Sequence, residues 1–116
     1  MLGVGIDIIE VSRIKHLIKS KGDKFLNRIF SKKEISYCSS KINKYERFSG
    51  RYAAKEAVKK ALPYNENVLF KEIEILNNGD GSPYVQIKKP IYNHIKMHIS
   101  ISHISEFATS IAVIEN

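Results

Sequence analysis

Apolar residues recur along this chain with two different periods, and each period predicts one type of secondary structure. From residue 2 to residue 9 the side chains alternate, with Leu2, Val4, Ile6 and Ile8 on one face and Gly3, Gly5, Asp7 and Ile9 on the other. This alternation predicts a strand that packs on one side. Residues 10–19 carry apolar side chains at helical spacing and predict a helix.

Two short helices are predicted to follow. Gly22 breaks the first helix, and the apolar residues within 25–29 predict a short second one. Ser31 and Glu34 have the spacing of a capping box, in which each side chain satisfies a backbone N–H of the other residue. The box predicts the start of a third helix, which extends to about Ser39.

The longest helix is predicted from Lys44 to Leu62, with Pro63 ending it. Strands are then predicted at residues 68–76, 83–88, 97–104 and 107–114. The turn-forming residues at 77–82 predict a hairpin between the first two of these strands. The order of elements predicts a single α+β domain over residues 1–116, with a mainly antiparallel sheet packed against the long helix and shorter helices beside it.

Length and composition exclude several classes of protein. With 116 residues, 43% of them hydrophobic and 27% charged, the chain has the composition of an ordinary folded domain. The longest apolar runs are too short to span a bilayer, and the first residues lack the pattern of a signal peptide. The single cysteine, Cys38, can form no internal disulfide, so we interpret it as a structural thiol in a reducing cytoplasm. The formal charge of +7 favours acidic partners without choosing among them.

Asp7 is an unusual residue for an otherwise apolar strand, because aspartate has a low strand propensity. Its neighbours on the same face are Gly3 and Gly5, which leave room for a ligand or another backbone to approach. Alternatively, Asp7 is a strand-end carboxylate that caps the next helix or pairs with Arg13. The residues alone leave both interpretations open.

The segment 51–57 places a charged pair among alanines in the middle of the long helix. Glu56 lies beside the stripe that we expect in the core, which consists of Ala54, Val58 and Ala61. A basic face at four-residue steps is formed by Arg51, Lys55 and Lys59. The alternative is a solvated helix in which Glu56 pairs with Lys60, a contact that contributes roughly 0.2–0.5 kcal/mol.

Ser102 and His103 end a predicted strand. A hydrolase pair is a weak interpretation, because the chain has no Gly-x-Ser-x-Gly turn and no identifiable third group to orient the histidine. The remaining histidines show no grouping with cysteine that is typical of a zinc site.

Taken together, these motifs resemble one family, and the resemblance covers nearly the whole chain. Its motifs, in order, are Gly5-Ile6-Asp7-Ile8 with Glu10 and Arg13, Phe30-Ser31-x-x-Glu34, Arg51-Tyr52-Ala53-Ala54-Lys55-Glu56-Ala57, Gly81-Ser82-Pro83-Tyr84 and Ser100-Ile101-Ser102-His103. They resemble the holo-[acyl-carrier-protein] synthases, the short single-domain branch of the 4′-phosphopantetheinyl transferases. The Ile6-Asp7-Ile8 and Ala54-Lys55-Glu56-Ala57 motifs are the specific ones.

The resemblance implies an enzyme that moves the 4′-phosphopantetheine arm of coenzyme A to a serine of an acyl carrier protein in fatty acid biosynthesis, releasing 3′,5′-ADP. It implies that Asp7 and Glu56 bind Mg²⁺, which prefers oxygen ligands. Glu56, or a water that it orients, is the implied base for the serine proton. His103 is the implied phosphate contact and second catalytic residue.

Lower-ranked contacts to coenzyme A are implied for Arg51, Lys60 and Ser102. The resemblance also implies that the acidic carrier protein docks on basic residues of the first helix, at Arg13 with help from Lys15 and Lys19. It implies a homotrimer with active sites shared between subunits. The chain departs from the family at residues 63–67, where relatives commonly have a glycine-rich turn.

Two rival interpretations remain. A small RNA-binding domain would need aromatic residues on adjacent strands beside a basic patch, and Tyr84 alone is thin support for it. A catalytically idle scaffold would have little use for Asp7, Glu56 and His103. We therefore expect neither a nucleic-acid nor a membrane partner.

Overall fold

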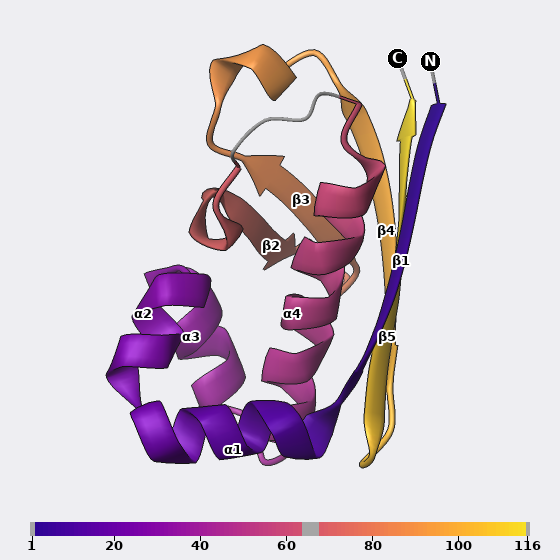
Figure 1. Ribbon diagram of the computed structural model, residues 1–116. Helices are drawn as coiled ribbons and strands as arrows, with labels where there is room; N and C mark the ends of the chain where they lie inside the picture. Colours follow the sequence, from indigo (N-terminus) through magenta and orange to yellow (C-terminus); the bar gives the residue numbers. More distant parts are fainter. Residues whose placement is uncertain (1, 64–67, 116) are drawn as a thin grey trace.

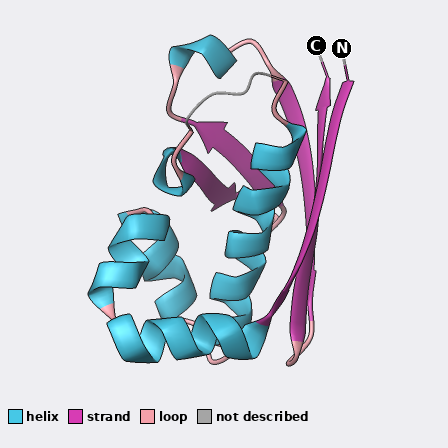
Figure 2. Ribbon diagram, viewed as in Figure 1, coloured by secondary structure: helices cyan, strands magenta, loops and turns pink. Residues whose placement is uncertain are grey.

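In the computed structural model, which describes residues 2–63 and 68–115, a three-stranded antiparallel sheet lies along one face of a long helix (Figure 1). The sheet has the order β1-β5-β4, with β1 at Leu2–Glu10, β4 at Lys96–His103 and β5 at Phe107–Glu115. The long helix is α4, Lys44–Ala61. Its other side is covered by a layer of short helices and a hairpin (Figure 2).

The covering layer contains the remaining elements. Its helices are α1 (Val11–Lys21), α2 (Asp23–Ile29) and α3 (Lys32–Ser39). Its hairpin pairs β2 (Ile73–Asn77) with β3 (Pro83–Ile87), and two 3-10 turns, η1 (Phe70–Glu72) and η2 (Pro90–Tyr92), flank it. α4 thus lies between the sheet and this layer and contributes buried residues to both core clusters of the molecule.

The predicted α+β class, the antiparallel pairing and the long helix are confirmed. The strand predicted at 68–76 is shorter, because η1 occupies its first half and β2 begins only at Ile73. The hairpin also forms a separate two-stranded sheet. The departure noted at 63–67 falls largely on residues 64–67, which lie outside the described part of the chain.

β1 packs on one side as predicted, but through its glycine face. Ile6 and Ile8 are 63% and 66% exposed, whereas Gly5 and Ile9 are buried against α4. The apolar face of the strand therefore points away from the core of this chain. The period of two indicated the strand correctly, but it did not indicate which of the two faces is buried.

The glycines are required because the backbones of β1 and α4 nearly touch. A Cβ atom built on Gly5 would lie 1.9 Å from the carbonyl oxygen of Ala57, and one on Gly3 would lie 2.1 Å from that of Ala61. No side chain, however small, fits at such distances. Alanines on the facing side of α4 make the same approach possible from the helix.

A buried ion pair fastens α4 to the covering layer. Lys55 Nζ donates to Glu34 Oε1 at 2.8 Å and to the backbone carbonyls of Phe70 and Ile73 at 2.9 and 2.5 Å. Glu34 Oε2 accepts from the Ile75 N–H at 2.8 Å, and the predicted capping box with Ser31 is present. The pair is fully buried, so its charges are held by these hydrogen bonds instead of by water.

The basic residues predicted on one face of α4 therefore do not form a solvated surface. Lys55 is completely buried, and Arg51 is nearly so, while only Lys59 faces solvent. Burial lowers the pKa of Lys55, and the Glu34 carboxylate acts in the opposite direction. Helical spacing placed the three residues on one face, but a second layer covers most of that face.

Gly5→Ala is expected to lower the free energy of unfolding by about 3 kcal/mol or to prevent folding, since its methyl group would overlap the Ala57 carbonyl. Urea denaturation measures the change. Gly79→Ala is the matched control, because a Cβ there meets no atom within 4 Å. Equal stability of the two variants would show that β1 and α4 are not in backbone contact.

Cys38 is buried among the helices of the covering layer, and burial raises the pKa of its thiol to about 12. Above an ordinary thiol pKa of 9.0 the folded chain therefore keeps a proton that the unfolded chain releases. It follows that the free energy of unfolding falls as the pH rises above 9.0. This environment agrees with the interpretation of a structural thiol.

At pH 8 the native thiol is expected to react with Ellman's reagent at least about a hundredfold more slowly than the same thiol in guanidinium chloride, because only the thiolate attacks. Absorbance of the released chromophore follows both reactions. Similar rates in the two solutions would mean that Cys38 is accessible in the folded state.

Candidate active site

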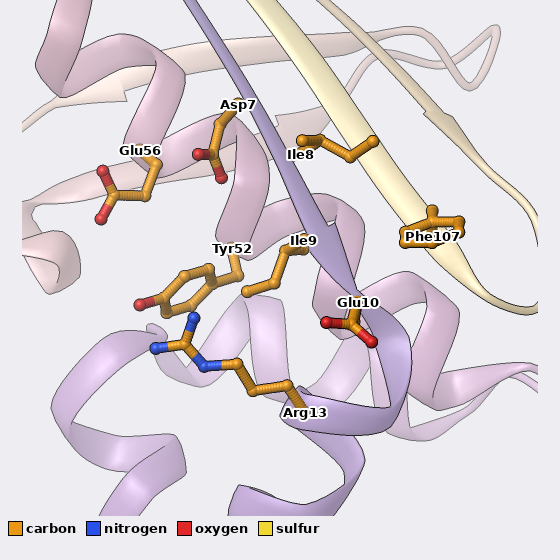
Figure 3. A pocket seen from close by; sticks show the side chains of 8 residues that line it. All are labelled: Asp7, Ile8, Ile9, Glu10, Arg13, Tyr52, Glu56 and Phe107. Atoms are coloured by element: carbon orange, nitrogen blue, oxygen red, sulfur yellow. The ribbon is translucent and has the colours of Figure 1, made fainter.

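An open cleft of about 360 Å³ lies where β1 passes beside α4 and runs into α1 (Figure 3). Its lining combines two carboxylates, an arginine and an aromatic ring with apolar strand residues. The lining residues are Asp7, Ile8, Ile9, Glu10, Arg13, Tyr52, Glu56 and Phe107. The cleft therefore contains the carboxylates singled out from the sequence.

Asp7 and Glu56 come from elements that are far apart in the sequence and pressed together in the fold. Asp7 follows Gly3 and Gly5 on the face of β1 that contacts α4. Glu56 lies next to Ala57, whose carbonyl is the contact of Gly5. Both carboxylates point into the same open space beside β1 (Figure 3). The close packing of strand and helix is thus what brings them together.

Lys60 reaches the same place from the next turn of α4. Its Nζ lies 3.3 Å from Asp7 Oδ1 and donates to the backbone carbonyl of Ile6 at 3.1 Å. The pairing of Glu56 with Lys60 that we considered from the sequence is not what the structure shows, because Lys60 pairs with Asp7 instead. The ion-pair partner of Lys60 is therefore Asp7 of β1.

The donor set of the cleft fits a magnesium ion. Within residues 2–63 and 68–115 there is no cluster of three or more histidine, cysteine or acidic side chains that could hold a metal by themselves. Two carboxylates are nevertheless the usual protein contribution to Mg²⁺ sites whose other ligands are phosphate and water. The ammonium group of Lys60 on Asp7 also marks a place where a cation is stable.

Tyr52 is a residue of the cleft that the sequence interpretation did not identify. Its ring lies between Glu56 and Arg13, with the hydroxyl toward the guanidinium group (Figure 3). Burial raises the pKa of Tyr52, and the nearby Glu56 carboxylate raises it further. The only signal in the sequence was a large aromatic residue within an alanine-rich segment.

His103 lies outside this cleft, near the other edge of the sheet. Its Nδ1 lies 2.9 Å from Glu46 Oε1, in the first turn of α4. Glu46 is thus a group that orients the histidine, and the sequence did not reveal it because 57 residues separate the two. Since β5 runs between β1 and β4, the strands of Asp7 and His103 are about 10 Å apart.

Ser102 and His103 point to opposite faces of β4, as successive strand residues do. Ser102 is exposed on the outer face of the sheet, opposite Thr109 of β5. The two side chains therefore cannot act together as a nucleophile and its base, and the hydrolase interpretation has no geometric support.

Arg51 is also outside the cleft. Its guanidinium group donates to the side-chain oxygen of Asn77 at the end of β2 and lies over the ring of Tyr37, 4.4 Å from the ring centroid. Arg51 is 5% exposed, and its Nε is buried with no hydrogen-bond partner among the residues that the structure describes. The structure therefore places Arg51 beside the hairpin, apart from Asp7 and Glu56.

Comparison with known proteins gives a consistent result. Residues 3–112 match the family model of the 4′-phosphopantetheinyl transferase superfamily. The holo-[acyl-carrier-protein] synthase of Thermodesulfovibrio yellowstonii is 46% identical over 112 residues, which are 97% of this chain and 96% of that protein. The synthase of Protochlamydia amoebophila is 44% identical over 118 residues, covering 97% of this chain and 96% of that protein. The chain belongs to the holo-[acyl-carrier-protein] synthase family of 4′-phosphopantetheinyl transferases.

Solved structures of this family share the fold. The holo-[acyl-carrier-protein] synthase of Helicobacter pylori, in complex with coenzyme A, superposes with a TM-score of 0.86 at 32% identity, covering 97% of this chain and 99% of that one. The synthase of Bacillus anthracis, in complex with coenzyme A (3′,5′-ADP), has a TM-score of 0.81 at 35% identity, covering 97% and 94%. These are enzymes, and the fold expected from the resemblance is confirmed.

A second groove adjoins the cleft that contains Asp7 and Glu56. It has a volume of about 520 Å³ between α1 and α2, and Tyr52 lines both cavities. Its rim carries the basic side chains of Lys21, Lys24 and Arg28. Lys15, considered with Arg13 from the sequence, instead lies over the Tyr45 ring in a different depression.

No helix in the described residues is long and apolar enough to cross a bilayer.

Proposed function

We propose that this protein transfers the 4′-phosphopantetheine group of coenzyme A to a serine of apo acyl carrier protein, with Mg²⁺ bound by Asp7 and Glu56. The observation that carries the proposal is that these two carboxylates, far apart in sequence, line one cleft. A lysine, Lys60, also forms an ion pair with Asp7. Two structural relatives are complexes with coenzyme A, which supports coenzyme A as the substrate.

The reaction is a phosphoryl transfer in which the enzyme mainly positions its substrates and neutralises charge. The serine oxygen of the carrier forms a bond to the β-phosphorus of coenzyme A, and the bond from that phosphorus to the bridging oxygen breaks. 3′,5′-ADP leaves with the electron pair. Bound Mg²⁺ would offset the charge of the diphosphate and of the leaving group.

Glu56 is the proposed acceptor of the serine proton, directly or through a water that it orients. It lines the cleft as a proposed metal ligand and makes no ion pair with any described residue, so its carboxylate is available. Asp7 is engaged with Lys60 and is the weaker candidate for this role.

Lys60, His103, Arg51 and Ser102 are the proposed contacts to the phosphates and the nucleotide. Lys60 is already at the cleft, while the other three lie elsewhere on the chain. In a single chain they do not surround one ligand. A neighbouring subunit that supplied them would complete the site.

The outer face of the sheet supports such an assembly. Large apolar side chains of β1 and β5 lie together there in register, and they comprise Val4, Ile6, Ile8, Phe107 and Ile111. An exposed apolar patch of this kind marks an interaction surface in a folded protein. We propose that it is the interface of a homotrimer, and Phe107 connects it to the cleft because this residue also lines the cavity.

The carrier protein is proposed to dock on the basic side of the molecule. Arg13 lines the cleft, and the adjoining groove continues the positive charge along α1 and α2. An acidic partner bound there would present its serine at Tyr52, where the two cavities meet. Charge complementarity of this type governs the association rate and makes it sensitive to salt.

We infer a cytoplasmic enzyme of fatty acid biosynthesis without a nucleic-acid or membrane partner. The buried, unpaired thiol of Cys38 is consistent with a reducing compartment. Tyr84 is exposed on the hairpin, but no stacking platform of neighbouring aromatic residues is found with it in the described chain. An RNA-binding role therefore gains no support.

Incubation with coenzyme A, Mg²⁺ and an apo acyl carrier protein is expected to add the mass of one phosphopantetheine arm to the carrier, as measured by intact mass spectrometry. Asp7→Asn and Glu56→Gln are expected to lower the rate by about 100-fold or more, and a chelator to abolish it. Glu72→Gln, which removes a carboxylate remote from the cleft and keeps its hydrogen-bond acceptor, is the control. No mass gain with several folded carriers would refute the proposal.

For the assembly, light scattering is expected to give the mass of three chains. Ile6→Lys should produce monomers with little transferase activity, because a charge in the apolar face is costly to bury. Ile42→Lys is the control, since Ile42 is fully exposed outside the sheet. A monomeric wild-type protein with full activity would contradict the shared site.

A further inference from the structure

The ammonium group of Lys60 contacts Asp7, one of the two carboxylates that we propose as ligands of Mg²⁺. Its Nζ lies between Asp7 Oδ1 at 3.3 Å and the Ile6 carbonyl oxygen at 3.1 Å. The lysine side chain is 53% exposed, whereas that of Asp7 is 17% exposed. Lys60 is thus the more solvent-exposed partner of the pair, and Asp7 is the more buried one.

No other described side chain pairs with Asp7. Of the cations in residues 2–63 and 68–115, Lys60 alone lies within ion-pairing distance of this carboxylate. Arg13 lines the same cleft but turns toward Tyr52 (Figure 3). Lys60 is therefore the group that neutralises Asp7 in the free chain.

The contact is not needed to hold β1 on α4. That packing is made by Gly3 and Gly5 of β1, which lie against the backbone carbonyls of Ala61 and Ala57. A half-exposed ion pair adds little to stability because water and salt screen it. The position of Lys60 is better explained by the charge of the cleft than by the fold.

We propose that Lys60 is an exchangeable counter-ion, which holds Asp7 in the free enzyme and gives it up when Mg²⁺ binds. This inference rests on the metal site proposed above. Both cations need the same carboxylate, and like charges at this separation repel each other. A bound divalent ion would therefore displace the ammonium group of Lys60, whose flexible four-carbon stem would allow it to turn toward an anion in the cleft.

The diphosphate of coenzyme A is the anion that would receive the released lysine. Without it, Lys60 competes with the metal for Asp7; with it, the lysine gains a new partner as the metal takes its place. Binding of metal and of coenzyme A is then positively coupled. Thermodynamic linkage requires that each raises the affinity of the other by the same factor.

Lys60→Met tests the exchange by binding instead of by turnover. Mn²⁺, measured by electron paramagnetic resonance in the absence of coenzyme A, is expected to bind about tenfold more tightly to the variant, because one repelling charge is gone. Coenzyme A, measured calorimetrically at saturating Mg²⁺, is expected to bind about tenfold more weakly. A lysine with a purely structural role would not move the two affinities in opposite directions.

Two variants serve as controls. Lys59→Met removes the same charge from the preceding residue, whose ammonium lies over the Phe70 ring, 4.7 Å from the ring centroid, and both affinities should stay within about twofold of the wild type. Lys60→Arg keeps the charge and should restore weak Mn²⁺ binding in the absence of coenzyme A. Thermal unfolding verifies that each variant is folded, and Lys60→Gln repeats the test with a polar side chain.

The outcomes separate this inference from the proposed function. If Asp7→Asn binds Mn²⁺ as tightly as the wild type does, the metal site itself is wrong and the exchange falls with it. If Asp7→Asn loses the metal but Lys60→Met and Lys60→Gln bind it no more tightly than the wild type, the exchange alone is overturned. Tighter metal binding with weaker coenzyme A binding supports it.

Discussion

The contact between the backbones of β1 and α4 is the constraint on which the rest of the molecule depends. Gly3 and Gly5 allow the strand to approach until their Cα atoms lie against helix carbonyl oxygens. Asp7, two residues further along the same face, is carried to the side of α4 where Glu56 and Lys60 emerge. A larger residue at either glycine would separate the strand from the helix and, with it, the two carboxylates.

The opposite side of α4 is secured by a different interaction. Lys55 and Glu34 form a buried pair whose remaining hydrogen bonds go to the backbone of η1 and β2. Removal of one partner of such a pair leaves an uncompensated charge in the interior, which makes the arrangement sensitive to mutation. The helix that carries Glu56 is thus held by steric fit on one face and by charge on the other.

Charge is distributed unevenly over the surface, and its placement agrees with the proposed reaction. The two carboxylates of the cleft are accompanied by Lys60 and Arg13, and the basic groove begins at Tyr52. Other proposed phosphate contacts, His103 and Arg51, have partners of their own in Glu46 and Asn77. In the proposed function, a second chain bound at the apolar outer face of the sheet would bring such residues to the cleft of its neighbour.

Much of this could be predicted from the sequence. Local patterns determined the elements and the α+β class, because strand alternation, the capping box at Ser31 and the proline at position 63 act over a few residues. The sequence motifs alone single out Asp7 and Glu56, and the structure places them in one cleft. The boundaries of β2 were less predictable, since a 3-10 turn and a strand start have similar local sequences.

What only the tertiary structure decided were the contacts between distant segments. The sequence by itself determined which residues could form strands and helices and which carried unusual chemistry. It did not determine that β1 buries its glycines and exposes Ile6, that Lys55 is interior, or that Glu46 orients His103. Each of these depends on the shape and charge of a partner element elsewhere in the chain, and a local pattern contains no information about that partner.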